Sequence, residues 1–465
     1  MGRLHFVPTA LRADANKLAW ALGLQLESGN TFGINKTDGL TTNSHYGCHA
    51  WKNLFPETLP SGVNWATYGL TEATALAALD SVRTRSTSST DTIAQLATMV
   101  GQLKDLWRTK KWFPGHYSNP LPSHYLDLVK RDEIYAELAA TPALRGIQIG
   151  IDFGLTETNL NTYDFSIVGD ALDRSAAIGK YVMLGFSWRE FESSAGMNNL
   201  LPADMRGSSG SYTDDPNWAH TIYTNAWAYK KSNSPGNYGY NLKLSSSTVQ
   251  ARLDNYFSQL SQYVYAHANG SRLVSITTSE SAIGTPVIDG DTTGQFEGQT
   301  AVINLLSKYF VTEVVLAMIN NTRPYVRTVV NGAVNSGIGI GSPNAHLANS
   351  LNMTPEDGNN GVLVYYPLMA GQVPLSPEVQ GSDWGSTVGD KYVFDYPTPQ
   401  YLYERRLALK ANFIVWMRQT TPWFTGHVNP VTGQNMSCLA FLKTDPRVLA
   451  NPEGGLESAL PSIYH

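Results

Sequence analysis

Short apolar runs and amphipathic helices alternate along the chain from about residue 111 onward. The run Tyr181–Trp188 is nearly continuous in apolar residues, which is typical of a strand buried on both faces of a parallel sheet. Thr248–Ala266 instead repeats its large apolar residues at helical spacing, and Ser247 before it is a suitable N-cap. The two patterns recur in turn, so strands are predicted to alternate with helices.

Extending this reading over the chain predicts eight strands and the helices between them. The predicted strands are Trp112–Ser118, Gly146–Phe153, Tyr181–Trp188, Arg272–Ser279, Tyr325–Val330, Ile338–Ile340, Val373–Gln380 and Phe413–Met417; the predicted helices are Tyr125–Ala140, Ile167–Gly179, Thr248–Ala266, Thr300–Asn320 and Leu402–Lys410. Eight alternating units indicate an α/β fold, a parallel (β/α)8 TIM barrel. A doubly wound open sheet is the alternative, but the sequence has no Gly-rich phosphate loop of a nucleotide fold.

Two further segments are predicted around this barrel. Residues 1–90 are expected to form a small, mostly helical N-terminal module, ending in the polar run Thr84–Thr90 as a linker, and residues 91–465 the barrel domain. Within the barrel domain, a long insertion at about 192–244 carries Trp218, Trp227 and several Tyr. Loops at the carboxyl ends of barrel strands build substrate sites. We expect the insertion either to line a substrate cleft or to form a small core of its own.

Charge and composition argue against two classes of binding partner, nucleic acids and membranes. The net charge of −5 and the lack of a Lys/Arg cluster argue against nucleic acid. The longest apolar stretch, around 310–319, is interrupted by Thr312 and Glu313, so no membrane span is expected. The first twenty residues lack the apolar segment of a secretory signal, and a soluble protein is expected, with a secreted location and a phage particle both left open. The 11 Trp and 24 Tyr suit either a large core or sugar-stacking surfaces.

Several kinds of chemistry are not expected. Cys48 and Cys438 lie nearly 400 residues apart, which excludes a disulfide framework and favours two free thiols over one bond. The ten His include no HExxH pattern and no close pair with an acid, so no metal site is expected. The Gly-x-Ser-x-Gly pattern of an α/β-hydrolase nucleophile is absent. No cofactor is expected.

Two glutamates stand at predicted strand ends. Glu280 ends the predicted fourth strand and Glu378 the predicted seventh. Barrel enzymes carry their catalytic groups at the carboxyl ends of the strands. Two carboxyl groups about 5–5.5 Å apart cleave a glycosidic bond with retention of configuration, whereas a separation of about 6.5–9.5 Å admits a water and gives inversion.

On these two positions, Thr278-Ser279-Glu280 and Pro377-Glu378-Val379, residues 111–425 resemble a large group of retaining (β/α)8-barrel glycoside hydrolases of the clan A type. The resemblance implies an acid/base Glu after the fourth strand and a nucleophile Glu after the seventh. In that group an Asn precedes the acid/base Glu and contacts the sugar 2-hydroxyl, whereas Ser279 stands here. In that group a Trp at the end of the eighth strand commonly forms the floor of the sugar-binding site, and Trp416 fits that position.

Further polar and aromatic side chains are candidates for substrate binding, and each has a structural interpretation beside the functional one. Glu190 is the strongest rival for a catalytic role, although an ion pair with Arg189 or a plain loop position is the more common use of such a residue. Asn331 precedes a Gly and can simply form a turn. The candidates are Asp152, Glu190, Asn331, His116, Tyr117, Tyr366, Trp188, Trp384 and Trp416.

These features predict a glycoside hydrolase that cleaves a polysaccharide by a retaining double displacement. One alternative is a polysaccharide lyase on the same barrel, with His116, Tyr117 or Tyr366 as the base and an acidic polymer as substrate. The other is a non-catalytic carbohydrate-binding or structural barrel of a phage tail or surface assembly. The hydrolase requires Glu280 and Glu378 to face each other at one end of the barrel.

Overall fold

The computed structural model describes residues 110–190, 199–207, 221–222, 224–230, 238–278, 292–310, 312–319, 330, 333, 338–342, 365–379, 399–418, 424 and 437–464. The module predicted over residues 1–90 lies outside these ranges.

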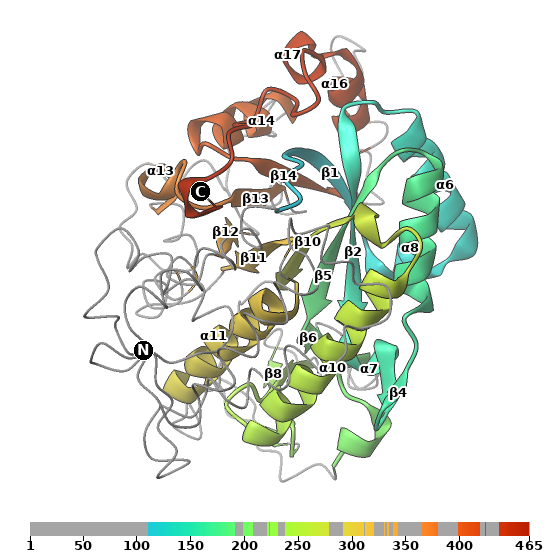
Figure 1. Cartoon of the computed structure of the whole chain (residues 1–465), viewed down its shortest axis with the longest axis vertical. Helices are drawn as coiled ribbons and strands as arrows, with labels where there is room; N and C mark the ends of the chain where they lie inside the picture. The colour runs from blue at the N-terminus through green and yellow to red at the C-terminus, as the bar shows by residue number, and fades with distance from the viewer. Residues whose placement is uncertain are drawn as a thin grey trace, which may run out of the picture.

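Eight parallel strands form a closed barrel (Figure 1). They are β1 (Gly115–Pro120), β2 (Leu144–Asp152), β5 (Tyr181–Ser187), β10 (Leu273–Thr278), β11 (Val314–Met318), β12 (Gly339–Ser342), β13 (Leu375–Val379) and β14 (Phe413–Arg418). Each strand lies beside the next barrel strand in the chain, and β14 pairs with β1 to close the ring. The structure confirms the predicted TIM barrel, with β10 as its fourth strand and β13 as its seventh.

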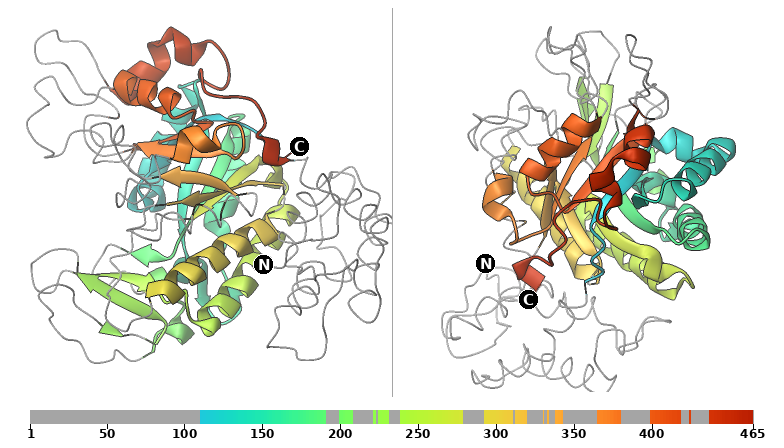
Figure 2. Two further views of the ribbon diagram at one scale, coloured as in Figure 1. Left: turned by 90° about the vertical axis from the view of Figure 1, so that its left-hand side faces the viewer. Right: turned by 90° about the horizontal axis from the view of Figure 1, so that it is seen from above.

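Helices surround the outside of the barrel in the turned views of Figure 2. They are α5 (Pro122–Leu126), α6 (Leu128–Ala139), α7 (Phe153–Thr156), α8 (Ser166–Ala177), α10 (Ser247–Ala266), α11 (Thr292–Tyr309), α13 (Tyr365–Met369), α14 (Pro399–Ala408), α16 (Cys438–Thr444) and α17 (Pro446–Leu449). The N-cap of α10 is Ser246, one residue before the predicted one, and its side chain accepts from the N–H of Val249. Short 3-10 turns η3 (Ala203–Met205), η4 (Gly270–Arg272) and η7 (Ser462–Tyr464), with the hairpin β3 (Glu157–Asn159) and β4 (Thr162–Tyr163), complete the connections.

The prediction of the fifth strand is wrong. The fifth barrel strand is β11, Val314–Met318, and not Tyr325–Val330. The residues of β11 had been included in the predicted helix Thr300–Asn320, but α11 ends at Tyr309. A run of five apolar residues fits a buried strand and a buried helical turn equally well, and no Gly or Pro separates this run from the helix.

Part of the long insertion forms a four-stranded antiparallel sheet. Its order is β6-β9-β8-β7, with β6 (Arg189–Glu190), β7 (Thr221–Ile222), β8 (Ala226–Lys230) and β9 (Tyr238–Leu242). Because β6 directly follows β5, the sheet begins at the carboxyl ends of the barrel strands, and it extends away from them in Figure 2. Ala226, Tyr240 and Leu242 are buried within the main hydrophobic core. The insertion therefore shares a core with the barrel; Trp218 lies outside the described residues.

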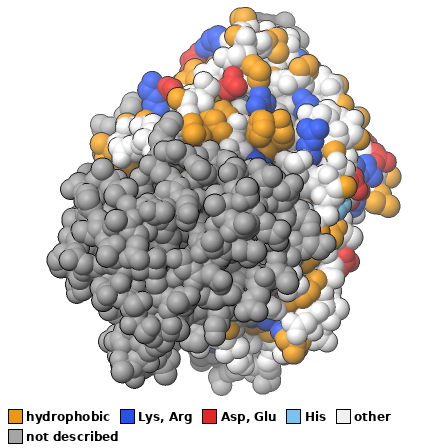
Figure 3. Space-filling model, in the orientation of Figure 1, with side chains coloured by type: hydrophobic (Ala, Val, Ile, Leu, Met, Phe, Trp, Pro, Cys, Tyr) orange, Lys and Arg blue, Asp and Glu red, His pale blue; other side chains and the backbone are white. Residues whose placement is uncertain are grey.

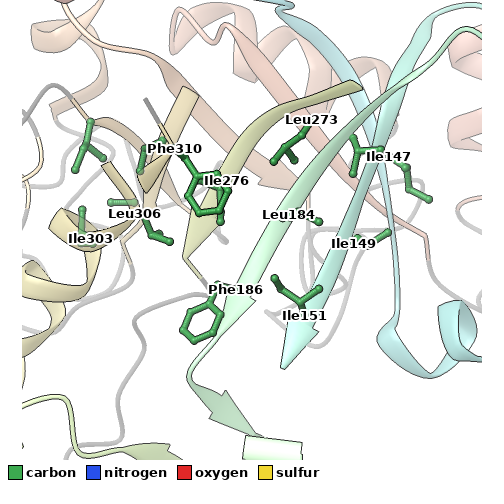
Figure 4. Close-up of a cluster of buried hydrophobic side chains, with 14 of the residues drawn as sticks. Ile147, Ile149, Ile151, Leu184, Phe186, Leu273, Ile276, Ile303, Leu306 and Phe310 are labelled. Atoms are coloured by element: carbon green, nitrogen blue, oxygen red, sulfur yellow. The ribbon is translucent and has the colours of Figure 1, made fainter. Parts of the chain in front are cut away.

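Apolar side chains pack on both sides of the barrel wall. On the outside, Ile147, Ile149 and Ile151 of β2 belong to the core formed with the helices (Figure 4). On the inside, a separate cluster fills the barrel; its buried members are Tyr117, Met183, Val274, Val314, Leu316, Phe413 and Val415. The face in Figure 3 shows basic and acidic side chains of the described residues interspersed without a basic patch. None of the described helices is long and apolar enough to cross a membrane.

A buried ion pair ties three strands together at the amino-terminal end of the barrel. Lys111, just before β1, places its Nζ 2.7 Å from Oε1 of Glu313, just before β11. The same Nζ donates to the carbonyl of Leu273 at the start of β10. Burial opposes ionisation of Glu313, but the charge of Lys111 and donation from Lys111 and Tyr265 outweigh it and lower the Glu313 pKa. Glu313 is therefore favoured in its ionised form despite its burial.

The C-terminal segment crosses the same end of the barrel. Trp112 donates its indole N–H to the carbonyl of Ser458, and Asn412 donates its side-chain amide to the carbonyl of Glu457. The N–H of Ser462 donates to the carbonyl of Gly371. Since these partners lie just before β1, β14 and β13, the segment covers the amino-terminal ends of those strands.

Glu313→Gln should therefore lower the free energy of unfolding by about 3 kcal/mol or more, because it leaves the ammonium of Lys111 partly buried without its counter-charge. Urea unfolding at neutral pH measures the change. The matched control is Glu457→Gln, which breaks the exposed Lys410–Glu457 pair and should cost less than about 1 kcal/mol. Equal losses in the two variants would contradict a special role for the buried pair.

Candidate functional site

The inward face of β2 is polar or lacks side chains, in contrast to its outward face. Since Ile147, Ile149 and Ile151 pack outward, strand alternation directs Gln148, Gly150 and Asp152 into the barrel. Register confirms the direction: Gln148 pairs with Met183, a member of the interior cluster. The sequence of β2 thus delivers a neutral amide at mid-strand and a carboxylate at its end.

Glu378 lies on the inward face of β13, one residue before the end of the strand. It pairs in register with Val415 of the interior cluster, and only 6% of its surface is exposed. Its Oε1 accepts a hydrogen bond of 3.1 Å from Nε2 of Gln148. Two strands, β1 and β14, separate β2 from β13 in the sheet, so this bond crosses the barrel interior.

The backbone of Glu378 is held from outside the barrel. Arg406 on α14 is fully buried and donates from Nη2 to the main-chain carbonyl of Glu378. Tyr366 on α13 is also fully buried, and the charges of both Arg406 and Glu378 act on its phenol. Glu378 is therefore held at its main-chain carbonyl by Arg406 of α14, and its side chain accepts a hydrogen bond from Gln148.

Polar side chains on the inward faces of the strands have unused hydrogen-bonding capacity. The described residues provide no partner for Oε1 of Gln148, Oγ1 of Thr277 or Oγ of Ser376. All three residues are buried. A Cβ placed on Gly185 would lie 3.5 Å from Nε2 of Gln148 and 3.6 Å from Oγ1 of Thr277, which puts these two side chains around one glycine. Groups of this kind ordinarily find partners in a folded core.

The predicted acid, Glu280, lies outside the described residues, two positions beyond the last residue of β10. Since all eight strands are parallel, β10 and β13 end at the same rim of the barrel. Asp152, the last residue of β2, is buried at that rim. Asn331 and Trp384 lie outside the described residues. Glu190 pairs through its backbone with Tyr240 in the small sheet, and its side chain is outside the described part of the structure.

Trp416 and His116 lie away from the barrel interior, contrary to the prediction for both. Trp416 pairs in register with Val379 and so faces outward, into the core shared with Phe441 of α16. Its indole N–H donates to Nδ1 of His116 at 2.9 Å. Nε2 of His116 lies 3.1 Å from the carbonyl of Gly454, so it carries the proton. Both rings are fully buried, and this pair holds the C-terminal segment against β1 and β14.

Tyr117 and Trp188 are also core residues rather than lining residues. Tyr117 belongs to the interior cluster, donates to the carbonyl of Phe113 and is fully buried. Trp188 is fully buried after β5, where its carbonyl accepts from the N–H of Leu242. Neither ring can stack on a sugar in this position, because neither offers a surface to solvent.

None of the three bases named for a lyase suits that reaction. Burial raises the pKa of Tyr366 and of Tyr117, which keeps both phenols protonated. Burial lowers the pKa of His116 to about 4, and both its ring nitrogens are already engaged.

No protein-family model and no curated protein matches this sequence. Among solved structures, the catalytic domain of a beta-amylase from Paenibacillus polymyxa aligns with 72% of this chain and 100% of its own length, at 10% identity and a TM-score of 0.45. A beta-galactosidase from Bacillus circulans sp. alkalophilus aligns with 72% of this chain and 55% of its own, at 12% identity and a TM-score of 0.44. A beta-glucanase from Saccharophagus degradans in complex with cellotetraose aligns with 71% of this chain and 87% of its own length, at 11% identity and a TM-score of 0.39. Likenesses this distant do not bear on the reaction, and the barrel is established by its own strand pairing.

Sequence reasoning missed Gln148, Thr277, Ser376 and Arg406. A signal for Gln148 was present, because the segment Gly146–Asp152 alternates small or polar residues with isoleucines. That alternation marks a face of the strand that does not belong to the apolar core. Among the described residues, no three His, Cys, Asp or Glu side chains are placed to hold a metal ion.

The depressed pKa of His116 predicts a pH-dependent stability. Its folded pKa of about 4 lies below the ordinary 6.5, so between these values the unfolded chain binds a proton that the folded chain does not. The contribution of His116 to the free energy of unfolding is therefore complete above about pH 6.5. It should decrease by up to about 3 kcal/mol as the pH drops toward 4. His116→Gln should show a shallower fall, measured by urea unfolding at several pH values. If the free energy of unfolding depended on pH equally in His116→Gln and wild type, His116 would make no such contribution.

Proposed function

We propose that this protein is a retaining glycoside hydrolase that cleaves a polysaccharide, with Glu378 as nucleophile and Glu280 as acid/base. The observation that carries the proposal is the buried carboxylate of Glu378, which projects into the barrel near the carboxyl end of the seventh strand and is bonded to Gln148. Barrel enzymes perform their chemistry at this end. The burial and inward direction of this glutamate support a chemical role over a surface ion pair.

The reaction needs only two carboxyl groups and a water. In the first step Glu280 gives its proton to the glycosidic oxygen as the bond from that oxygen to the anomeric carbon breaks, and an oxygen of Glu378 bonds to that carbon. In the second step a water attacks the anomeric carbon, Glu280 takes the proton of the water, and the ester bond breaks to return an electron pair to Glu378. The product keeps the configuration of the substrate.

A polymeric substrate is supported by the insertion. The small sheet begins at the same rim as Glu378, and its sequence from about 192 to 244 is rich in Trp and Tyr. Such rings bind sugar faces through stacking. Because the insertion is long and begins at the rim that carries Glu378, we propose that it contacts sugar units beyond the cleaved bond.

Glu378→Gln and Glu280→Gln should each lower turnover by several orders of magnitude while the fold persists. General acid–base assistance alone contributes about 10²–10⁴-fold, and the loss of the nucleophile removes the covalent step. Reducing-sugar release from a polysaccharide panel measures the effect, and melting temperature reports folding. The matched control is Glu457→Gln at the opposite end of the barrel, which should retain wild-type turnover.

Azide should partly restore Glu378→Ala with an activated glycoside and give a glycosyl azide of inverted configuration, because a small anion can occupy the space of the missing carboxylate. Near wild-type activity in Glu378→Gln would move the nucleophile to Glu190 or Asp152. An unsaturated product absorbing in the ultraviolet would identify a lyase. Binding of sugars without cleavage by the wild-type protein would identify a non-catalytic barrel.

A further inference from the structure

The inner surface of the barrel is open to solvent near the carboxyl ends of four neighbouring strands, β14, β1, β2 and β5. The inward residues there are partly exposed, whereas the inward residues one step deeper are buried; the exposed set is Met417, Asn119, Gly150 and Ser187, and the buried set is Val415, Tyr117, Gln148 and Gly185. On β11, β12 and β13 the last inward residues are all buried; they are Met318, Gly341 and Glu378. Since β14 pairs with β13, this opening adjoins the strand that carries Glu378.

Asn119 lies on the inward face at this opening. It follows Tyr117, a member of the interior cluster, by two residues, and strand alternation places both on the same face. It also pairs in register with Met417, which follows Val415 of that cluster by two residues. The two strands therefore agree that the Asn119 side chain is directed into the barrel.

Packing and turn formation do not account for an asparagine at this position. Asn is depleted in strands and favours turns, where its side chain bonds to nearby backbone. Here Pro120 follows directly, and a residue before proline is held in an extended conformation. The side chain of Asn119 makes no hydrogen bond within the described structure. Its amide therefore keeps one acceptor and two donor hydrogens for a ligand at the opening.

A glycine leaves space beside this amide. Gly150 lies on β2, the strand next to β1, and it is partly exposed on the inward face. Among the described residues, a Cβ placed on Gly150 would come within 4 Å only of Cγ of Pro122, at 3.4 Å. A side chain at this position would project into the opening, whereas glycine leaves room for a bulky ring.

The charges at the opening determine which ligand fits. At the inward positions near the carboxyl ends of the described strands, the charged side chains are the acids Asp152 and Glu378, and no Lys or Arg is present. An anionic ligand would place like charges together, which costs several kcal/mol in a close contact. A neutral ligand with hydroxyl groups has no such cost and satisfies the amide of Asn119.

We propose that Asn119 is a substrate-binding residue and that the site takes an uncharged sugar, whose ring lies over Gly150. The amide oxygen accepts from one hydroxyl and the amide N–H donates to the next hydroxyl of the same ring. A planar amide presents these two groups side by side, which matches neighbouring hydroxyls on a pyranose. This inference rests on the proposed function and deepens it by assigning the class of substrate.

The test uses Asn119→Leu, which is close in size but cannot hydrogen-bond, and an aryl glycoside that wild type cleaves. With this glycoside kcat/KM should fall about 10- to 100-fold, because a sugar hydroxyl loses its partner. With the monodeoxy analogue that lacks the bound hydroxyl, the variant and wild type should differ by less than about threefold. A residue that acted only on folding would lower kcat/KM equally for every analogue, and that result would overturn the assignment.

Three further variants make the test independent of one substitution. Asn119→Asp keeps the shape, loses the donors and should show the same dependence on the hydroxyl, which decides the question if Asn119→Leu does not fold. Gly150→Ala should raise KM about tenfold at an unchanged melting temperature; an unchanged KM would overturn the placement of the ring over Gly150. The matched control is Asn269→Leu before β10, whose amide bonds to Asp173 and which should keep wild-type kcat/KM.

The charge of the sugar is tested with wild type alone. The aryl glycuronide of the same ring configuration should be cleaved about 100-fold less efficiently than the neutral glycoside, because its carboxylate meets the acids of the opening. Equal cleavage of the two would overturn the assignment of an uncharged sugar while the hydrolase still stood. Failure of wild type to cleave any glycoside would instead remove the proposed function itself.

Discussion

The pairing of the first and last barrel strands is the constraint on which the site depends. Six successive residues of β1, from Gly115 to Pro120, pair in parallel with six of β14, from Phe413 to Arg418. This pairing joins segments about three hundred residues apart and leaves the barrel sheet without a free edge. Once the ring is closed, the inward face of each strand is determined, and inward side chains of β2 and β13, three positions apart around the ring, can meet in the interior. The contact between Gln148 and Glu378 is a product of that closure.

The two ends of the barrel make opposite use of buried polar groups. At the amino-terminal end, Glu313 is fully buried and accepts from Lys111 and Tyr265. Its charge is compensated and it contributes to stability. Inside the barrel, by contrast, Thr277 and Gln148, the donor to Glu378, keep polar atoms without a partner among the described residues. A barrel whose interior served only stability would not keep such groups, because each opposes folding.

The architecture was largely accessible from the sequence, since seven of the eight predicted strands coincide with β1, β2, β5, β10, β12, β13 and β14. β11 was not, because its five apolar residues continue the apolar pattern of α11 without a breaking residue. The position of Glu378 followed from strand order alone. The side-chain directions of Trp416 and His116 could not be predicted in this way. A strand of a parallel sheet is apolar on both faces, so its sequence pattern does not reveal which face is inward. Only the register with Val379 shows that Trp416 points to the helices.

The central claim is that Glu378 forms a covalent bond to the sugar. A 2-deoxy-2-fluoro glycoside with a good leaving group slows hydrolysis of the intermediate and allows it to accumulate, so that mass spectrometry of the digested protein locates the attached sugar. The account predicts the label on Glu378, on the peptide that contains β13, and no label in Glu378→Gln. A label on Glu190, Asp152 or any other residue, or turnover that proceeds with inversion and without a label, would contradict it.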